Sequence, residues 1–159
     1  MPLYLEDLAP GMTVTAGPVT LTEADMIAFA RQYDPQPFHT DPVAAKDTFF
    51  EGLAGSGWYV AALTMRMLAD SPLAEIANGL IGIELRSLRW PRPSRPGDTL
   101  RLTVEILETK PSRSRPGFGT ALVRWTTRNQ KNETLMEAEN IMWVARRPEQ
   151  SEGNKNGQD

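Results

Sequence analysis

An almost uninterrupted apolar stretch from Trp58 to Leu68 (WYVAALTMRML) constrains the fold of this chain more than any other feature. Arg66 is the only charged residue within it. A helix that is apolar on every side is buried on every side, so the stretch predicts a central helix enclosed by other parts of the chain. At 159 residues, the chain has the size of one domain and can bury a substantial core.

The second half of the chain supplies strands that can enclose this helix. Apolar and polar residues alternate with the period of half-buried strands over residues 100–106, 121–126 and 136–144. Two further strands are predicted at residues 13–19 and 80–90. Turn-forming sequences rich in Pro, Gly and Asn separate the later strands. Helices followed by hairpin-linked strands predict an α+β domain, in which a strongly twisted antiparallel sheet wraps around the apolar helix.

Two shorter segments before the central helix also have helical signals. Residues 22–33 combine a capping threonine with an apolar stripe, and Pro35 ends the helix by disfavouring helical geometry at the residue before it. An Asp-Pro pair predicts a second short helix over residues 41–49. Residues 34–40 between them are therefore predicted to form a loop.

The composition excludes several kinds of site and partner. With no cysteine and one histidine, the chain has no disulfide, thiolate or histidine-rich metal site, and only a carboxylate site remains open. The net charge of −3 favours neither nucleic acid nor an anionic membrane as a partner. No apolar run approaches the roughly 18 residues of a membrane span, and no secretory signal pattern is present, so we expect a cytoplasmic protein.

The single histidine, His39, lies in the proline-rich sequence YDPQPFHTDP (residues 33–42), five positions after Asp34. Prolines fix backbone angles, so this segment can hold a carboxylate and an imidazole facing a common point. Two such groups can act as general acid and base on one water. The spacing alone leaves a structural alternative open, in which Asp34 begins a turn and His39 packs in the core.

A glycine-rich break, GLAGSG (residues 52–57), directly precedes the apolar helix. The N–H groups of Ser56 and Gly57 would lie unpaired at the positive end of the helix dipole. Gly57 has no side chain to keep a ligand oxygen away, so its N–H can stabilise a developing enolate oxygen. In the alternative, the glycines only allow close packing and Ser56 caps the helix.

Two segments, YDPQPFHTDPVAAKDTFFEGLAGSGWYVAAL and LRWPRPSRPGDTL, together resemble the MaoC-like family of (R)-specific enoyl-CoA hydratases and dehydratases. The resemblance covers about residues 5–146 and rests on an Asp-x-Asn-Pro-x-His loop, a downstream glycine and an Arg-Pro-Gly-Asp turn. It implies the hot-dog fold for a single domain over residues 1–148. Residues 149–159 lack large apolar residues and are predicted to be a disordered tail.

By this resemblance, Asp34 and His39 activate one water for syn addition to a trans-2-enoyl thioester, and the Gly57 N–H polarises its carbonyl. The candidate substrate contacts are Ser56, Trp58 and Gln36, although Trp58 can equally pack in the core or an interface. The substrate is implied to be a thioester of coenzyme A or acyl carrier protein, with no metal or redox cofactor. The chain is implied to form at least a homodimer.

Three positions depart from the family pattern. The Asn of the motif is Gln36, the residue before the oxyanion glycine is Ser56 where His is common, and a helix serine of some hydratases is Ala62. Two other functions therefore stay open: a hot-dog acyl-CoA thioesterase using Glu51, and a non-catalytic acyl-thioester-binding module. No arginine is assigned to the site.

Overall fold

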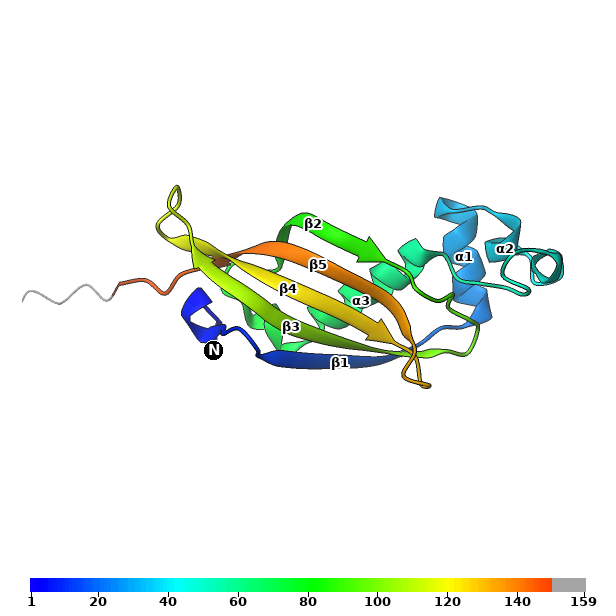
Figure 1. The fold of residues 1–159 in the computed structure, drawn as a ribbon, viewed down its shortest axis with the longest axis horizontal. Helices are drawn as coiled ribbons and strands as arrows, with labels where there is room; N and C mark the ends of the chain where they lie inside the picture. Colours follow the sequence, from blue (N-terminus) through cyan, green and yellow to red (C-terminus); the bar gives the residue numbers. More distant parts are fainter. Residues whose placement is uncertain (150–159) are drawn as a thin grey trace, which may run out of the picture.

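The computed structural model describes residues 1–149, and within them five strands form one antiparallel sheet in the order β1-β3-β4-β5-β2 (Figure 1). The strands are β1 (Thr13–Thr20), β2 (Ile81–Arg89), β3 (Thr99–Pro111), β4 (Phe118–Arg128) and β5 (Thr134–Ala145). The α+β class and the antiparallel sheet predicted from the sequence are confirmed.

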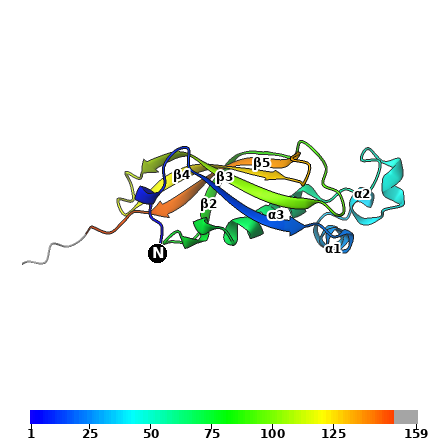
Figure 2. The same ribbon diagram turned by 90° about the horizontal axis from the view of Figure 1, so that it is seen from below.

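The helices lie along one face of the sheet and beyond one of its ends (Figures 1 and 2). The α-helices are α1 (Glu23–Tyr33), α2 (Pro37–Thr40) and α3 (Gly57–Ala69), and the 3₁₀ turns are η1 (Leu5–Asp7), η2 (Ala44–Asp47) and η3 (Pro72–Glu75). The predicted cap of α1 is present, because the Thr22 hydroxyl accepts a hydrogen bond from the Asp25 N–H at 3.2 Å. In Figure 2, α3 runs under the sheet, while α1 and α2 sit at the end where α3 begins.

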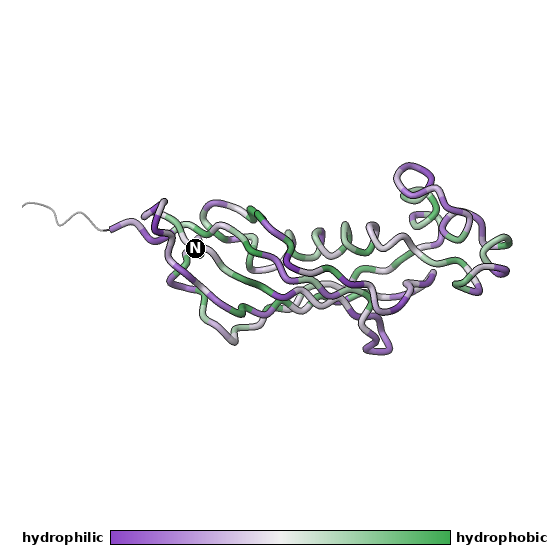
Figure 3. The backbone as a smooth tube through the Cα atoms, turned by 45° about the horizontal axis from the view of Figure 1, so that its top comes forward, coloured by the Kyte–Doolittle hydropathy of each residue, from purple (hydrophilic) through white to green (hydrophobic). Residues whose placement is uncertain are grey.

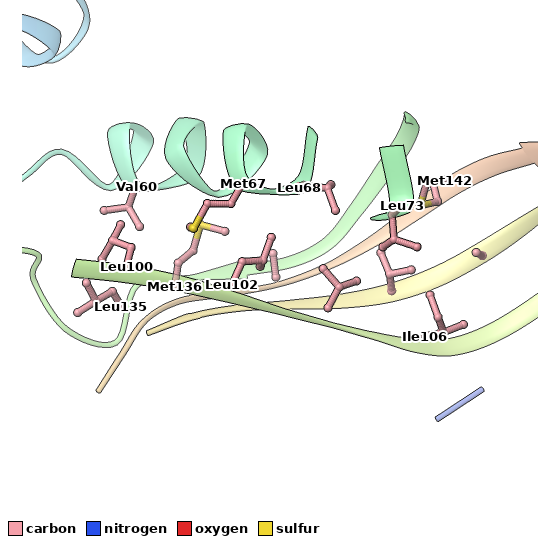
Figure 4. Close-up of a cluster of buried hydrophobic side chains, with 14 of the residues drawn as sticks. Val60, Met67, Leu68, Leu73, Leu100, Leu102, Ile106, Leu135, Met136 and Met142 are labelled. Atoms are coloured by element: carbon pink, nitrogen blue, oxygen red, sulfur yellow. The ribbon is translucent and has the colours of Figure 1, made fainter. Parts of the chain in front are cut away.

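The core fills the space between α3 and the sheet. Val60, Met67 and Leu68 of α3 point toward the strands, where they meet residues of β3 and β5 (Figure 4). These strand residues, all essentially inaccessible to solvent, are Leu100, Leu102, Leu135 and Met136. Burying each such side chain contributes about 1.5–3 kcal/mol to the stability of the fold. The apolar side chains of α3 and of the strands therefore stabilise the packing of the helix against the sheet.

The prediction that α3 is enclosed on all sides is wrong for the single chain. Trp58 is 58% exposed and Met65 is 39% exposed, and Ala62 also lies on the open side of the helix. Figure 3 shows α3 mostly in white and green, with the sheet on one side of it. A single sheet can cover only one face of a helix, so an apolar outer face is left uncovered in this chain.

The segment between α1 and α3 also differs from the prediction. Residues 34–40 contain a single helical turn, α2, which starts at Pro37 where the missing N–H has no cost. The helix predicted over 41–49 is only the 3₁₀ turn η2, although the Asp41 carboxylate accepts the N–H groups of Val43 and Ala44 as the predicted cap would. The tail predicted at 149–159 lies outside the described residues except for Glu149.

Candidate active site

The structure brings Asp34 and His39 together at the junction of α1 and α2. Asp34 ends α1, with its N–H bound to the carbonyl of Ala30 at 2.8 Å, and His39 is the third residue of α2. The Nε2 atom of His39 lies 3.3 Å from Oδ2 of Asp34. The proline-rich connection therefore holds the carboxylate and the imidazole side by side.

The backbone fixes the tautomer of the His39 ring. Its Nδ1 atom lies 2.7 Å from the carbonyl oxygen of Ala54, and a carbonyl can only accept, so Nδ1 carries a proton. In the neutral imidazole, the lone pair is then on Nε2, the nitrogen next to Asp34. The ring itself is 5% exposed and packs against Phe38 and Phe50. Its free nitrogen is thereby held in a fixed direction.

Two side chains donate hydrogen bonds to the Asp34 carboxylate. The Gln36 amide donates to Oδ1 at 2.5 Å, and the Ser56 hydroxyl donates to Oδ2 at 2.7 Å. Partial burial raises the pKa of Asp34, but these two hydrogen bonds and the nearby charge of protonated His39 together lower it below its ordinary value. The carboxylate is thus stabilised in its ionised form.

Ser56 and Gln36 were expected to contact substrate, and in the structure both side chains hydrogen-bond to the Asp34 carboxylate. Both bind Asp34, and neither lines the pocket described below. Ser56 is the residue before α3, but its hydroxyl makes no capping bond because it is used by Asp34. The alternative in which Ser56 acts as a side-chain helix cap is therefore wrong. Gln36, in place of the family's Asn, still reaches the carboxylate.

Gly57 presents a free N–H at the start of α3. Within residues 1–149 this N–H donates to no backbone or side-chain acceptor. A Cβ at this position would come within 2.7–2.9 Å of three ring atoms of Trp90, so only glycine fits beneath the indole. The open amide at the positive end of a 13-residue helix is the donor geometry that oxyanion stabilisation requires.

One pocket of about 350 Å³ connects these groups, within the range of about 300–1,000 Å³ usual for small-molecule sites. Asp34, His39 and Gly57 all line it. Five of its lining residues are buried: His39 and four that we call the pocket floor, Gly55, Val60, Ser94 and Leu135. Its outer lining includes the exposed aromatic residues Phe49, Trp58 and Trp90.

Trp58 lies at the mouth of this pocket and meets Trp90 edge to face, with ring centroids 5.0 Å apart. It is thus placed where a substrate contact was expected. Glu51, the carboxylate of the thioesterase alternative, is exposed and does not line the pocket. The only carboxylate in the pocket lining is that of Asp34.

Arg95 has a structural part in the site that the sequence reasoning missed. Its guanidinium group donates to three backbone carbonyls, at 2.6 Å to Phe50, 3.1 Å to Gly52 and 3.2 Å to Leu53. The turn beneath it is closed by the Asp98 carboxylate, which accepts the Arg95 N–H at 2.8 Å. The Arg-Pro-Gly-Asp turn therefore anchors the segment that carries the pocket's phenylalanines.

Residues 1–149 lack two features that would have indicated other functions. No group of three or more His, Cys, Asp or Glu side chains is arranged to hold a metal ion. No helix in that part of the chain is long and apolar enough to cross a bilayer.

Residues 7–129 match the family model described as "MaoC like domain". Among curated proteins, the uncharacterized protein YdeM of Bacillus subtilis (strain 168) is 27% identical over 145 residues, covering 91% of this chain and 100% of YdeM. Protein MaoC of Klebsiella aerogenes is 29% identical over 114 residues, covering 70% of this chain but only 33% of that protein.

Solved structures show the same architecture. The MaoC-like dehydratase from Rhodospirillum rubrum is 42% identical, with a TM-score of 0.88, covering 92% of this chain and 99% of its own. An (R)-hydratase from A. caviae involved in PHA biosynthesis is 24% identical, with a TM-score of 0.70 and coverages of 90% and 99%. A double-hotdog protein of Mycobacterium tuberculosis, Rv0216, is 20% identical, with a TM-score of 0.75 and coverages of 99% and 48%. The hot-dog fold expected from the resemblance is confirmed.

Proposed function

Because the chain belongs to the MaoC-like dehydratase family, we propose that it hydrates trans-2-enoyl-CoA to (R)-3-hydroxyacyl-CoA and catalyses the reverse dehydration. A general hydratase or dehydratase activity follows from the family; the substrate and the roles of individual residues are the proposal. The proposal depends mainly on one observation. Nε2 of His39 lies 3.3 Å from Asp34 in a pocket that also contains the unpaired Gly57 N–H.

In this proposal, a single water binds between Asp34 and His39. The Nε2 lone pair of His39 takes a proton from the water as its oxygen attacks the β-carbon of the enoyl thioester. Asp34, which its lowered pKa keeps ionised, orients the water and stabilises the imidazolium. Protonated His39 then delivers the proton to the α-carbon, so that water adds as a whole across the double bond.

The Gly57 N–H is proposed to stabilise the negative charge that develops on the thioester oxygen by donating a hydrogen bond to it. The thioester carbonyl is neutral before attack, and negative charge builds on its oxygen as the β-carbon bonds to water. A donor that strengthens during this step favours the transition state over the ground state, and one such donor contributes about 2.7–4 kcal/mol. Syn addition follows if one acid–base pair serves one face of the substrate, and the (R) configuration is proposed from the resemblance to (R)-specific hydratases.

The remaining expectations about substrate and assembly belong to the same proposal. The acyl group is carried on coenzyme A or acyl carrier protein, no metal or redox cofactor takes part, and the protein acts in the cytoplasm.

We propose a homodimer formed through the sheet edge at β2, where Ile81, Ile83 and Leu85 are each about half exposed. The sheet order leaves the other edge of β2 unpaired within the described residues.

A direct assay tests the proposal. Crotonyl-CoA and longer trans-2-enoyl-CoA thioesters are offered to the wild type and to His39→Ala, hydration is followed by loss of enoyl-thioester absorbance, and the product is resolved by chiral chromatography. The wild type should form the (R) product, and His39→Ala should be at least about 100-fold slower. Equal activity, or equal inactivity across all chain lengths, would contradict the proposal. Thiol release that depends on Glu51 would support a thioesterase instead.

A further inference from the structure

Arg101 of β3 and Arg128 of β4 lie directly opposite each other in the sheet, and we call them the arginine pair. Their neighbours Leu100, Leu102 and Thr127 are buried on the side of α3, so the two arginines point away from that helix. They lie on the face of the sheet that α3 does not cover (Figure 2). Like charges in directly opposed positions destabilise a strand pair, so an anion bound between them would stabilise this part of the sheet.

The strands supply no negative partner for the arginine pair. Within residues 1–149, neither arginine takes part in an ion pair. The positions beside them in the register are all uncharged: Gly17 and Pro18 at the bulge of β1, Thr134 of β5, and the next pair along β3 and β4, Thr103 with Thr126. The positive charge of the pair is therefore not balanced by its neighbours in the sheet.

The acidic side chains on the same face of the sheet are bound by other arginines. Arg124 contacts Glu105 at 3.3 Å and Glu139 at 3.1 Å. Arg89 contacts Glu137 at 2.6 Å. The fold therefore provides carboxylates for Arg124 and Arg89, whereas the arginine pair has none.

The arginine pair lines a second pocket of about 320 Å³, which shares no lining residue with the candidate active site. We call it the arginine pocket, and its other polar lining residues are Thr15, Thr103, Asn129 and Asn132. No acidic residue belongs to the lining. Arg101 is exposed, and no side-chain nitrogen of Arg128 is buried without a partner. Both guanidinium groups can therefore meet an anion that enters the pocket.

The chemistry of the lining favours a phosphate group. A guanidinium group stays charged, and its planar donors match two phosphate oxygens at once. Directly opposed residues of an antiparallel pair have Cβ atoms about 4.5–5.5 Å apart, so two arginines can bind one dianion together. A carboxylate carries a single charge and would balance only one of them. The threonine and asparagine side chains add neutral donors around the pair.

We propose that the arginine pair binds a phosphate group carried by a small molecule. Two sources fit this chemistry. One is the phosphorylated end of the coenzyme A that carries the proposed substrate, and the other is a separate phosphate compound that binds on its own. In either case the site recognises phosphate and takes no part in the chemistry on the acyl chain, because Asp34, His39 and Gly57 line the other pocket.

Calorimetric titration with inorganic phosphate and with adenosine 3′,5′-bisphosphate, at constant ionic strength, tests this inference. The proteins are the wild type, Arg101→Gln, Arg128→Gln and the control Arg113→Gln, which removes the same charge from an exposed residue outside the arginine pocket. At least one probe should bind the wild type and the control equally. It should bind each variant of the pair at least about 10-fold more weakly, because each loses charge-assisted hydrogen bonds. Arg101→Glu turns the like-charged pair into an oppositely charged one and should abolish binding without loss of the fold.

Hexanoyl-CoA and hexanoyl-pantetheine distinguish the two sources. If coenzyme A supplies the phosphate, Arg128→Gln should weaken binding of hexanoyl-CoA and leave that of hexanoyl-pantetheine unchanged. If a separate compound supplies it, Arg128→Gln should bind both thioesters as the wild type does, and the phosphate probe should still bind protein saturated with hexanoyl-CoA. The inference is overturned if neither probe binds the wild type, or if the variants of the pair bind it as Arg113→Gln does. None of these measurements involves turnover, so their outcome is independent of the proposed hydration.

Discussion

The Ser56 hydroxyl donates a 2.7 Å hydrogen bond to Oδ2 of Asp34, the same oxygen that lies 3.3 Å from Nε2 of His39. This bond joins the end of α1 to the residue that immediately precedes α3. The proposed acid–base pair is therefore fixed relative to the proposed oxyanion donor, because Ser56 and Gly57 are consecutive. A carboxylate held in this way has a lowered pKa.

Ser56→Ala should shift the pH dependence of the reaction. Removing a donor to the charged form raises the pKa of Asp34, so the part of the acidic limb of the kcat/KM profile that reports protonation of Asp34 moves to higher pH. We expect kcat/KM near neutral pH to fall by about 10-fold, as the carboxylate also loses a positioning bond. Hydration of crotonyl-CoA measured across the acidic range checks this. The control Ser71→Ala removes a buried hydroxyl outside the pocket lining and should leave the acidic limb of the profile unchanged. An unchanged acidic limb in Ser56→Ala would contradict the prediction.

Gly57→Ala should damage catalysis without loss of the fold. The new Cβ would lie within 2.7–2.9 Å of the Trp90 ring, so the indole or the start of α3 must move and the oxyanion donor moves with it. We expect kcat to fall about 100-fold, the loss typical of a removed oxyanion donor. Steady-state kinetics measure it. Gly117→Ala, where an added Cβ meets nothing within 4 Å, is the matched control. Wild-type kcat in Gly57→Ala would show that the amide is not the donor.

Arg95→Ala should destabilise the protein by about 2–3 kcal/mol, since it leaves three carbonyls of the Phe50–Leu53 segment without their charged donor. Arg95→Lys should recover only part of this, because an ammonium group cannot match the planar fork. Urea denaturation monitored by tryptophan fluorescence gives the free energy of unfolding. The control is Arg66→Ala, whose ion pair with Asp70 is largely exposed and should contribute less than about 0.5 kcal/mol. Equal effects of the two substitutions would refute the anchoring role of Arg95.

The alternating residues of the later strands were sufficient to predict the sheet. Leu100, Leu102 and their counterparts on β5 are buried at every second position, because a pleated strand packed on one side must follow that period. The nearness of Asp34 and His39 was likewise predictable, since prolines restrict the few residues between them. These parts of the fold and site depend on interactions that are local or periodic in the sequence.

Other features had no local signal. The open face of α3 depends on how many layers cover the helix, and the apolar residues Trp58 and Met65 cannot reveal that number. Arg95 binds backbone carbonyls, which are present at every residue and leave no mark in the sequence. The unpaired hydroxyl of Ser94 could not be predicted either, because being unpaired is a property of the assembled fold.

The exposed apolar edge of β2 predicts association of the protein with itself. Ile83→Lys places a charge on this edge and should convert the proposed homodimer into a monomer, because a charged edge strand resists pairing. Analytical ultracentrifugation of both proteins at the same concentrations measures the mass. Val43→Lys changes an exposed apolar residue outside the sheet and should leave the dimer intact. A monomeric wild type, or a dimer that survives Ile83→Lys, would rule out β2 as the interface.

The central claim is that one water is activated jointly by Asp34 and His39, and a double-mutant cycle on kcat/KM tests it most directly. Asp34→Asn, His39→Gln and the double variant are compared with the wild type on the same trans-2-enoyl-CoA. Each single substitution should lower kcat/KM by about 10²–10⁴-fold, and the double variant should be little worse than the poorer single variant, since groups that act as a unit are not additive. Near-wild-type single variants, or losses that multiply in the double variant, would contradict the claim.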